Sequence, residues 1–320
     1  MTLSAVSCIR RGITNLRANW ELILVSWFQG FLTAVLVVVG FVPPLAVVGF
    51  ASFDWVDATQ VDWSELLSQA GELMSRGSDA WLLLGASLLV SFAIWLAAFL
   101  VYCFFQGGII GILMTGDRQA PAGRLRGWQW FRTFSGRDLR GWGGQYLWRY
   151  FWLLNLFAVL GLLWMLVVTI VIGLTALGGE MWGMTAAFGI GCGASIPLGF
   201  GLVLLFLWAN LAQVDLARED SSVGTATRRS LGLVGRRLGA VTLMFVGVLL
   251  LVLVIGIGIS ILSLASNLLL PEAGSSQWMG AAFQLGLSGL EMILGSLVTV
   301  GFSASLVSLV RSEAALEPPA

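Results

Sequence analysis

The chain has 320 residues, of which 58% are hydrophobic and only 11% are charged. Soluble domains carry about 25% charged residues, so this composition excludes an ordinary water-soluble protein and indicates a chain lying largely in lipid. Arginine supplies all 17 positive charges, and the sequence contains no histidine. The absence of histidine removes the commonest general base, proton carrier and metal ligand.

The first twenty or so residues lack the short apolar core and small-residue cleavage site of a signal peptide. Their apolar side chains recur at every third or fourth position, which predicts an amphipathic helix lying on the membrane surface. The predicted apolar face consists of Val6, Ile9, Ile13, Leu16 and Trp20, with arginines between them.

Six apolar runs follow, each at least as long as the roughly 20 residues that a helix needs to cross a bilayer. They cover about residues 22–50, 80–114, 150–177, 186–211, 241–270 and 282–310. We therefore expect an all-α, polytopic membrane protein with six transmembrane helices, forming a single membrane domain over residues 1–320. Pro43 and Pro44 are expected to kink or end the first span.

The arginines lie almost entirely on one predicted side of the membrane. The segments before the first span, between spans two and three, between spans four and five, and after span six contain every arginine except Arg76. The positive-inside rule places these segments, and with them both termini, in the cytoplasm.

The link between spans two and three alternates basic and aromatic residues. Its prominent members are Arg124, Arg126, Trp128 and Trp130. Tryptophan favours the headgroup level of a bilayer, and arginine binds anionic lipid headgroups. We interpret this link as an interfacial anchor with no role in nucleic-acid binding.

The link between spans four and five predicts a second basic amphipathic helix. Ser221 or Ser222 can cap its N-terminus. The residues that fall broadly on its apolar face are Val223, Ala226, Leu231, Val234 and Leu238, while Arg228, Arg229, Arg236 and Arg237 spread over the rest. With the N-terminal helix, these links predict amphipathic interfacial helices on the cytoplasmic face.

Three stretches carry a resemblance to a known group of proteins. They are NLRANWEL (15–22), FFQGGIIGILMTGDRQAP (104–121) and AQVDLAREDSSVGTATRRSLGLVGRRLGAV (212–241). Together with the layout of spans, they resemble bacterial six-helix membrane proteins that include the membrane domain joined to glycerophosphodiester phosphodiesterases. Ala226, Arg229 and Ser230 fit the group's Ala-x-x-Arg-Ser helix after a short acidic turn. The resemblance implies this fold in a bacterial plasma membrane, and it implies no activity, because the metal-binding phosphodiesterase domain is absent here.

Glu291 is the ionisable residue that the sequence places well inside a span. A charge at such a position costs at least roughly 2.5–3.5 kcal/mol on insertion scales, so it marks a candidate intramembrane polar site. Two interpretations remain open: a structural hydrogen bond, or the handling of protons or cations. The glycine-rich fourth span around Pro197 has a similar alternative, a hinge or broken helix of the kind found in transporters.

Small and amide side chains add predictions about helix packing. Close approach of helices is predicted at the small-residue pairs Gly107/Gly111, Gly189/Gly193 and Gly256/Ser260. Hydrogen bonds between helices are predicted for Gln106, Asn155, Asn210 and Gln213.

The sequence offers no catalytic constellation and no metal-ligand spacing. We therefore expect a non-enzymatic integral membrane protein without a cofactor. It would act as a scaffold, as a lipid-interacting component, or as a docking site for a protein partner at the cytoplasmic face. The alternative is a small transporter or channel that uses Glu291 and the fourth span.

Overall fold

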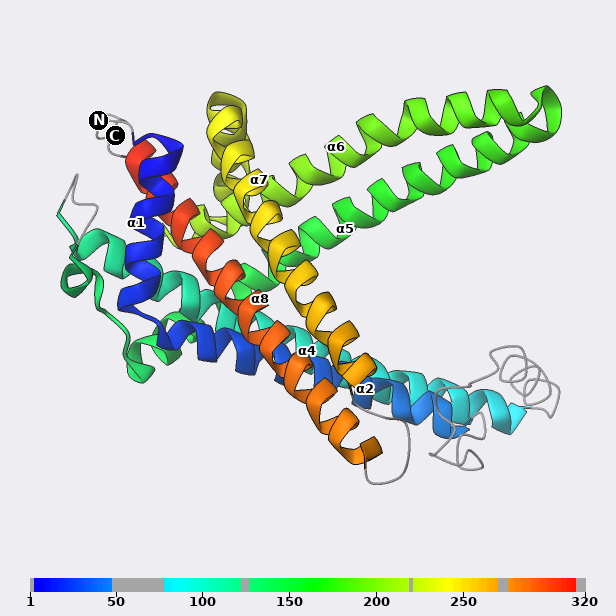
Figure 1. Ribbon diagram of the computed structural model, residues 1–320, viewed down its shortest axis with the longest axis horizontal. Helices are drawn as coiled ribbons and strands as arrows, with labels where there is room; N and C mark the ends of the chain where they lie inside the picture. Colours follow the sequence, from blue (N-terminus) through cyan, green and yellow to red (C-terminus); the bar gives the residue numbers. More distant parts are fainter. Residues whose placement is uncertain (1–2, 48–77, 122–126, 219–220, 270–275, 315–320) are drawn as a thin grey trace. The chain divides into compact units, whose positions relative to one another are not determined.

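The computed structural model describes residues 3–47, 78–121, 127–218, 221–269 and 276–314. All regular structure within these residues is helical, which confirms the predicted all-α class. The elements are α1 (Ala5–Ala18), α2 (Glu21–Val47), α4 (Ser78–Gln119), the short 3-10 helix η3 (Trp128–Phe131), α5 (Gly136–Trp182), α6 (Met184–Leu216), α7 (Val223–Leu269) and α8 (Ser276–Ala314) (Figure 1). Six of these helices, α2 and α4 to α8, are long and apolar enough to cross a membrane. The predicted span residues 48–50 and 270 lie outside the described residues.

The chain divides into two compact units, Phe28–Tyr102 and the remainder. In the first unit, the indole of Trp95 on α4 packs against α2. Its Nε1 donates to the carbonyl oxygen of Val37 at 3.1 Å, and its ring meets that of Phe41 at 5.0 Å. Gly40 lies directly under this indole, where a Cβ would have no room. The prolines at positions 43 and 44 are accommodated within α2, which continues to Val47.

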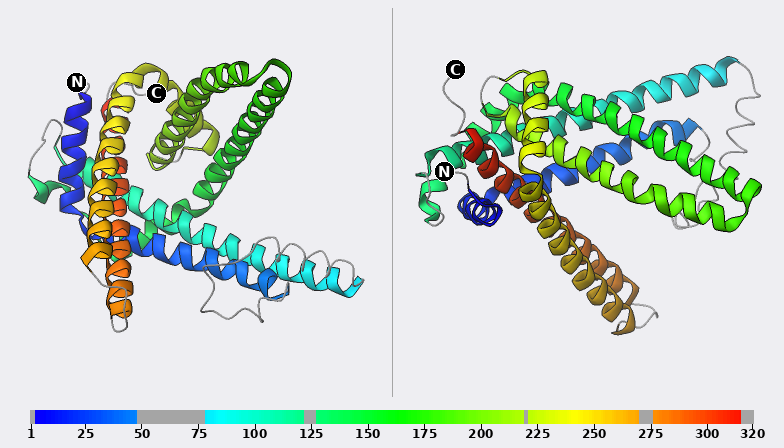
Figure 2. Two further views of the ribbon diagram at one scale, coloured as in Figure 1. Left: turned by 45° about the vertical axis from the view of Figure 1, so that its right-hand side comes forward. Right: turned by 90° about the horizontal axis from the view of Figure 1, so that it is seen from above.

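In the second unit, most helices pack against their neighbours in the chain, and the first helix packs against the last. α5 and α6 run side by side as an antiparallel hairpin (Figures 1 and 2). Gly183 joins them with φ 87°, a backbone conformation that favours glycine. α6 also contacts α7, α7 contacts α8, and α1 lies against α8.

The two longest helices, α5 and α7, extend well beyond the length that a bilayer requires. α5 and α7 each have 47 residues, or about 70 Å of helix at 1.5 Å per residue, against a hydrocarbon core of about 30 Å. Residues 136–149, predicted as part of an interfacial link, form the first turns of α5, and the predicted third span continues the same helix. In α7 a kink separates the part predicted to be interfacial from the part predicted to span, because Arg237 has non-helical angles of φ −124° and ψ 26°.

The predicted start of α7 is confirmed, and its predicted apolar face is partly wrong. Ser222 caps the helix, accepting a hydrogen bond from the backbone N–H of Thr225 at 3.3 Å. The buried residues before the kink are Ala226, Ser230, Leu233 and Val234, while Leu231 and Leu238 are exposed. The face that contacts the protein is thus rotated from the one the apolar pattern suggested.

The N-terminal helix is present and amphipathic, but it buries its polar side. Arg11, Asn15 and Asn19 are buried, whereas Val6 and Trp20 are 66% and 52% exposed. Gly12 permits this packing, because a Cβ there would lie 2.6 Å from the backbone nitrogen of Ser305 on α8. The prediction of a helix held on the membrane by its apolar face is therefore incomplete: the polar face is fixed by the protein itself.

Candidate functional site

A buried carboxylate at the end of α4 joins three helices. Asp117 is 1% exposed, and its Oδ1 accepts from Nε of Arg11 on α1 at 2.6 Å. Ser308 on α8 donates to the same oxygen at 3.0 Å. Arg311, one turn further along α8, donates to Oδ2 at 2.9 Å. A single negative charge thus lies between two guanidinium groups from the two ends of the chain.

The guanidinium group of Arg11 is almost completely enclosed. It is 3% exposed, and its NH2 atom also donates to the carbonyl oxygens of Asp117 and Ala120, at 2.9 and 3.3 Å. The ring of Phe131 lies over the guanidinium group, with Cζ of Arg11 5.0 Å from the ring centroid. A buried charge needs this density of partners, because desolvation costs several kcal/mol per ion.

Two asparagines extend this network toward η3. Asn15 donates to the carbonyl oxygen of Leu113 at 2.8 Å, and Asn19 donates to that of Phe131 at 2.7 Å. The side-chain oxygen of Asn19 accepts from the backbone N–H groups of Thr133 and Phe134 at 2.9 and 2.8 Å. These bonds fix the segment between η3 and α5. We call the whole network the polar layer; its members are Arg11, Asn15, Asn19, Asp117, Ser308 and Arg311.

The acidic residues near the polar layer are paired with arginine. Glu21 accepts from Arg132 at 2.6 Å, and Glu313 accepts from Arg237 at 2.5 Å. Burial raises the pKa of the neighbouring Cys8 thiol to about 11, with the charge of Asp117 contributing in the same direction. Asp117 is surrounded by arginine and serine donors, whereas a cation site needs several acceptor oxygens. No cluster of potential metal ligands occurs anywhere in the described part of the chain.

The end of α4 is held against α5 by the predicted glycine pair. A Cβ on Gly107 would lie 3.2 Å from the Tyr146 side chain, and one on Gly111 would lie 2.6 Å from that of Trp142. By contrast, Gly189, Gly193 and Gly256 have open space around them. The small-residue pattern is therefore used for close packing at one of the three predicted pairs.

The predicted amide contacts are confirmed for the glutamines and wrong for the asparagines. Gln106 donates to the side-chain oxygen of Gln213 at 3.2 Å, linking α4 to α6. Asn155 and Asn210 instead donate to carbonyl oxygens one turn back in their own helices, at 2.8 Å. Tyr150 adds a further link, donating to the carbonyl oxygen of Gln213 at 2.7 Å.

The predicted arginine-rich surface is only partly exposed. Arg228, Arg229 and Arg236 are exposed on α7 before the kink, whereas Arg237 is half-buried in its pair with Glu313. Trp128 and Trp130 of η3 are 46% and 49% exposed. Arg124 and Arg126 lie outside the described residues.

Glu291 lies on an exposed part of α8. The nearby Gly286, Gly289 and Gly295 have open space where a Cβ would be. The hinge or broken helix considered for the fourth span is not seen in α6, which continues as one helix through Pro197.

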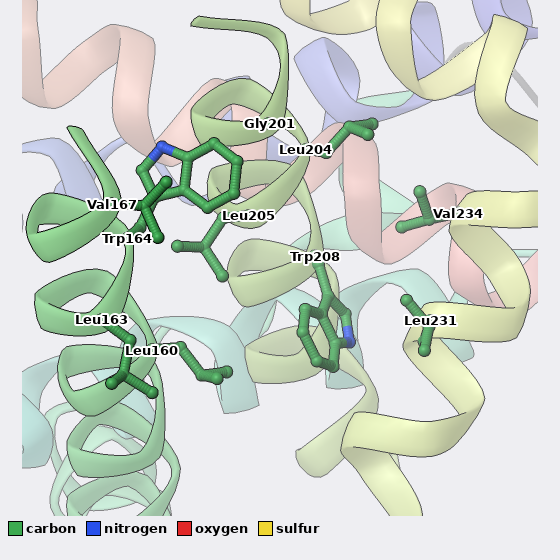
Figure 3. A pocket seen from close by; sticks show the side chains of 10 residues that line it. All are labelled: Leu160, Leu163, Trp164, Val167, Gly201, Leu204, Leu205, Trp208, Leu231 and Val234. Carbon is green, nitrogen blue, oxygen red and sulfur yellow. The ribbon is translucent and has the colours of Figure 1, made fainter. Parts of the chain in front are cut away.

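Among the cavities of the described residues, two apolar ones lie between helices, and Glu291 lines neither of these two. One, of about 400 Å³, lies among α5, α6 and α7. Figure 3 shows Leu205 and Trp208 of α6 between Trp164 of α5 and Leu231 of α7. The other, of about 340 Å³, lies among α1, α7 and α8.

Sequence reasoning missed the polar layer. Arg11, Asn15 and Asn19 form a polar stripe at helical spacing, and no contact within the protein was predicted for this stripe. One available signal was Asp117, an acidic residue directly at the end of an apolar run on the arginine-rich side. A carboxylate in that position favours a partner among the nearby arginines.

Fold and site together define a multi-pass α-helical membrane protein with a buried ionic network at one end of its helices. A scan of the chain against protein-family models found no match, and searches of curated proteins and of solved structures found no significant similarity.

Proposed function

We propose that the protein is a non-enzymatic, six-span component of a bacterial plasma membrane. Its arginine-rich end binds anionic lipid headgroups and offers the same surface to a protein partner. The observation that carries the proposal is the segment of α7 before the kink. One side of this segment is buried against the protein, and the other exposes Arg228, Arg229 and Arg236.

The fixed geometry of this segment favours headgroup binding. Trp208 of α6 donates from Nε1 to the carbonyl oxygen of Thr227 at 2.9 Å, and Ser221 donates to that of Asp215 at 3.2 Å. A helix held in this way needs no further ordering of its backbone when its guanidinium groups bind a headgroup. Each arginine near an anionic surface contributes about 1 kcal/mol, and its planar donors suit phosphate oxygens.

The proposed orientation rests on the arginine distribution. We place the polar layer and both termini on the cytoplasmic side, as the positive-inside rule requires. A C-terminal fusion to green fluorescent protein should fluoresce, whereas a fusion to alkaline phosphatase should be inactive. The reverse pattern would overturn the orientation.

We propose, from the three stretches that carry the resemblance, that the chain is related to the membrane domain of glycerophosphodiester phosphodiesterases. All three stretches that carry it meet in one place. Asn15 of the first bonds to Leu113 of the second, and Gln106 and Arg118 of the second bond to Gln213 and the backbone of Arg218 in the third. The three stretches are therefore in contact with one another in this protein.

Lipid binding is tested by comparing two matched pairs of substitutions. The full chain is placed in nanodiscs of phosphatidylcholine or of phosphatidylglycerol, and its thermal stability is measured. We expect phosphatidylglycerol to stabilise the wild type, and R228Q/R229Q to lose about 2 kcal/mol of that gain. The control R228K/R229K keeps both positive charges at the same positions and should retain most of it. Equal losses in both variants would show that the loss does not come from the charge and would refute headgroup binding at this surface.

The alternative, a transporter or channel, finds less support in the geometry. Glu291 lines neither of the two cavities described above, and α6 continues as one helix through Pro197. In proteoliposomes, E291Q should leave ion and proton fluxes at the wild-type level. A wild-type flux that E291Q abolishes would favour transport over the scaffold.

A further inference from the structure

The cavity among α1, α7 and α8 is an open apolar groove. Ile9, Ile13 and Leu16 of α1 form one wall, and Gly247 of α7 and Gly301 of α8 contribute to the others. A Cβ on Gly247 would meet no atom within 4 Å, so this part of the groove is empty of protein. Its volume of about 340 Å³ falls in the range of ligand sites, roughly 300–1,000 Å³.

The groove reaches from α1 into the spanning parts of α7 and α8. Its lining extends over residues 244–251 of α7 and 297–305 of α8, a depth of about 10 Å at 1.5 Å per residue. The neighbouring side chains of α7 are large, apolar and exposed, including Leu249, Leu250 and Leu253. Because these side chains belong to a helix apolar enough to span a membrane, the groove opens toward the acyl chains of the bilayer, which can fill it.

Arginines lie next to the opening on α1. Arg10 and Arg17 are exposed and stand one turn before and after Ile13, on the same side of the helix. Arg11, between them in sequence, is buried in the polar layer and holds α1 in place. The exposed face of α1 thus combines positive charge with an apolar groove directly beside it.

We infer that this groove is a binding site for one anionic phospholipid. One acyl chain lies along the groove past Ile13 and Gly247, and the phosphate group binds the guanidinium groups of Arg10 and Arg17. The acyl chain restores the dispersion contacts that an empty groove would forgo, and the arginines distinguish an anionic from a zwitterionic headgroup. This inference extends the proposed lipid binding, on which it rests, to a second and discrete site.

The groove is tested by filling it. G247L places a side chain in the groove, and the control G256L makes the same change on α7 at a glycine that also has open space and does not line the groove. The full chain is purified from membranes supplemented with dioleoyl phosphatidylglycerol, and bound lipid is counted by native mass spectrometry. We expect one retained phosphatidylglycerol in the wild type and in G256L, and about tenfold lower occupancy in G247L.

The headgroup contact is tested separately with R10Q/R17Q. In competition with dioleoyl phosphatidylcholine, this variant should lose the preference for phosphatidylglycerol by roughly tenfold to thirtyfold. The inference is overturned if the wild type retains no lipid, or if G247L and G256L retain it equally. A dimer that G247L alone dissociates would assign the groove to a second copy of the chain, and this would also overturn it.

The two lipid proposals fail in different ways. If the groove is empty and R228Q/R229Q still loses its stabilisation by phosphatidylglycerol, the proposed surface on α7 stands and the groove is refuted. If the lipid is retained and R228Q/R229Q behaves as the wild type, the α7 surface is refuted and the site on α1 stands.

Discussion

Replacing Asp117 with asparagine should destabilise the protein strongly. The substitution conserves shape, and the amide oxygen can still accept a hydrogen bond, but the negative charge is lost. Arg11 is 3% exposed, so its guanidinium group would remain buried without a counter-ion. Removing one partner of a buried ion pair costs about 3–5 kcal/mol. Arg311 is less affected, because its side chain is 30% exposed and can be hydrated.

The effect is measured by thermal unfolding of the purified chain in detergent. A change of 1 kcal/mol shifts Tm by about 2–4 °C for chains of 150–250 residues, so D117N should lower Tm by at least about 6 °C. D138N is the matched control, because Asp138 is exposed in the first turn of α5 and an exposed change costs about 0.5 kcal/mol.

A double variant separates the ion pair from general damage. In R11M/D117N both charges of the pair are gone, so the loss of stability should be smaller than the sum of the two single losses. A Tm for D117N within about 2 °C of the wild type, or strict additivity in the double variant, would refute a buried charge that depends on Asp117.

Three further predictions follow from contacts at the same end of the protein. N19A removes the side chain that fixes the segment after η3, so it should lower the free energy of unfolding by about 2–4 kcal/mol in a thermal unfolding experiment. The control N155A loses only a bond within its own helix and should lower it by less than about 1 kcal/mol. Equal losses in the two variants would argue against the network. G108A places a Cβ 2.7 Å from a carbonyl oxygen of α5 and should lower the free energy of unfolding by about 1–3 kcal/mol, while G144A, at a helical glycine with open space, should raise it by about 0.5–1 kcal/mol. Burial raises the pKa of the Cys8 thiol from 9.0 to about 11, so between these pH values the thiol is protonated in the folded chain and ionised in the unfolded chain. The free energy of unfolding should therefore fall as the pH rises from 9 to 11. A C8S variant should show a flatter fall in Tm there, and an identical fall would contradict the raised pKa.

The composition and the apolar runs were enough to predict the fold class. Long stretches without charge can satisfy their backbone groups in lipid only as helices, which is why the six spans were readable without any tertiary information. The cap of α7 was narrowed to Ser221 or Ser222 by the same local logic, since a capping side chain acts within one turn, and the structure assigns it to Ser222. Local signals also placed the start of α7, but they could not show where its interfacial part turns into the span at Arg237.

The polar layer and the buried face of α1 were decided by tertiary structure. An amphipathic helix has one apolar and one polar side, and the pattern alone does not say whether protein, lipid or water covers either side. Arg11 is buried because Asp117, more than a hundred residues away, supplies a counter-charge that no local rule connects to it. Likewise Asn19 is buried because the backbone after η3 needs its side chain. The sequence by itself thus determined which segments are helical and membrane-spanning, and the contacts between distant segments determined which charges are enclosed and which remain exposed.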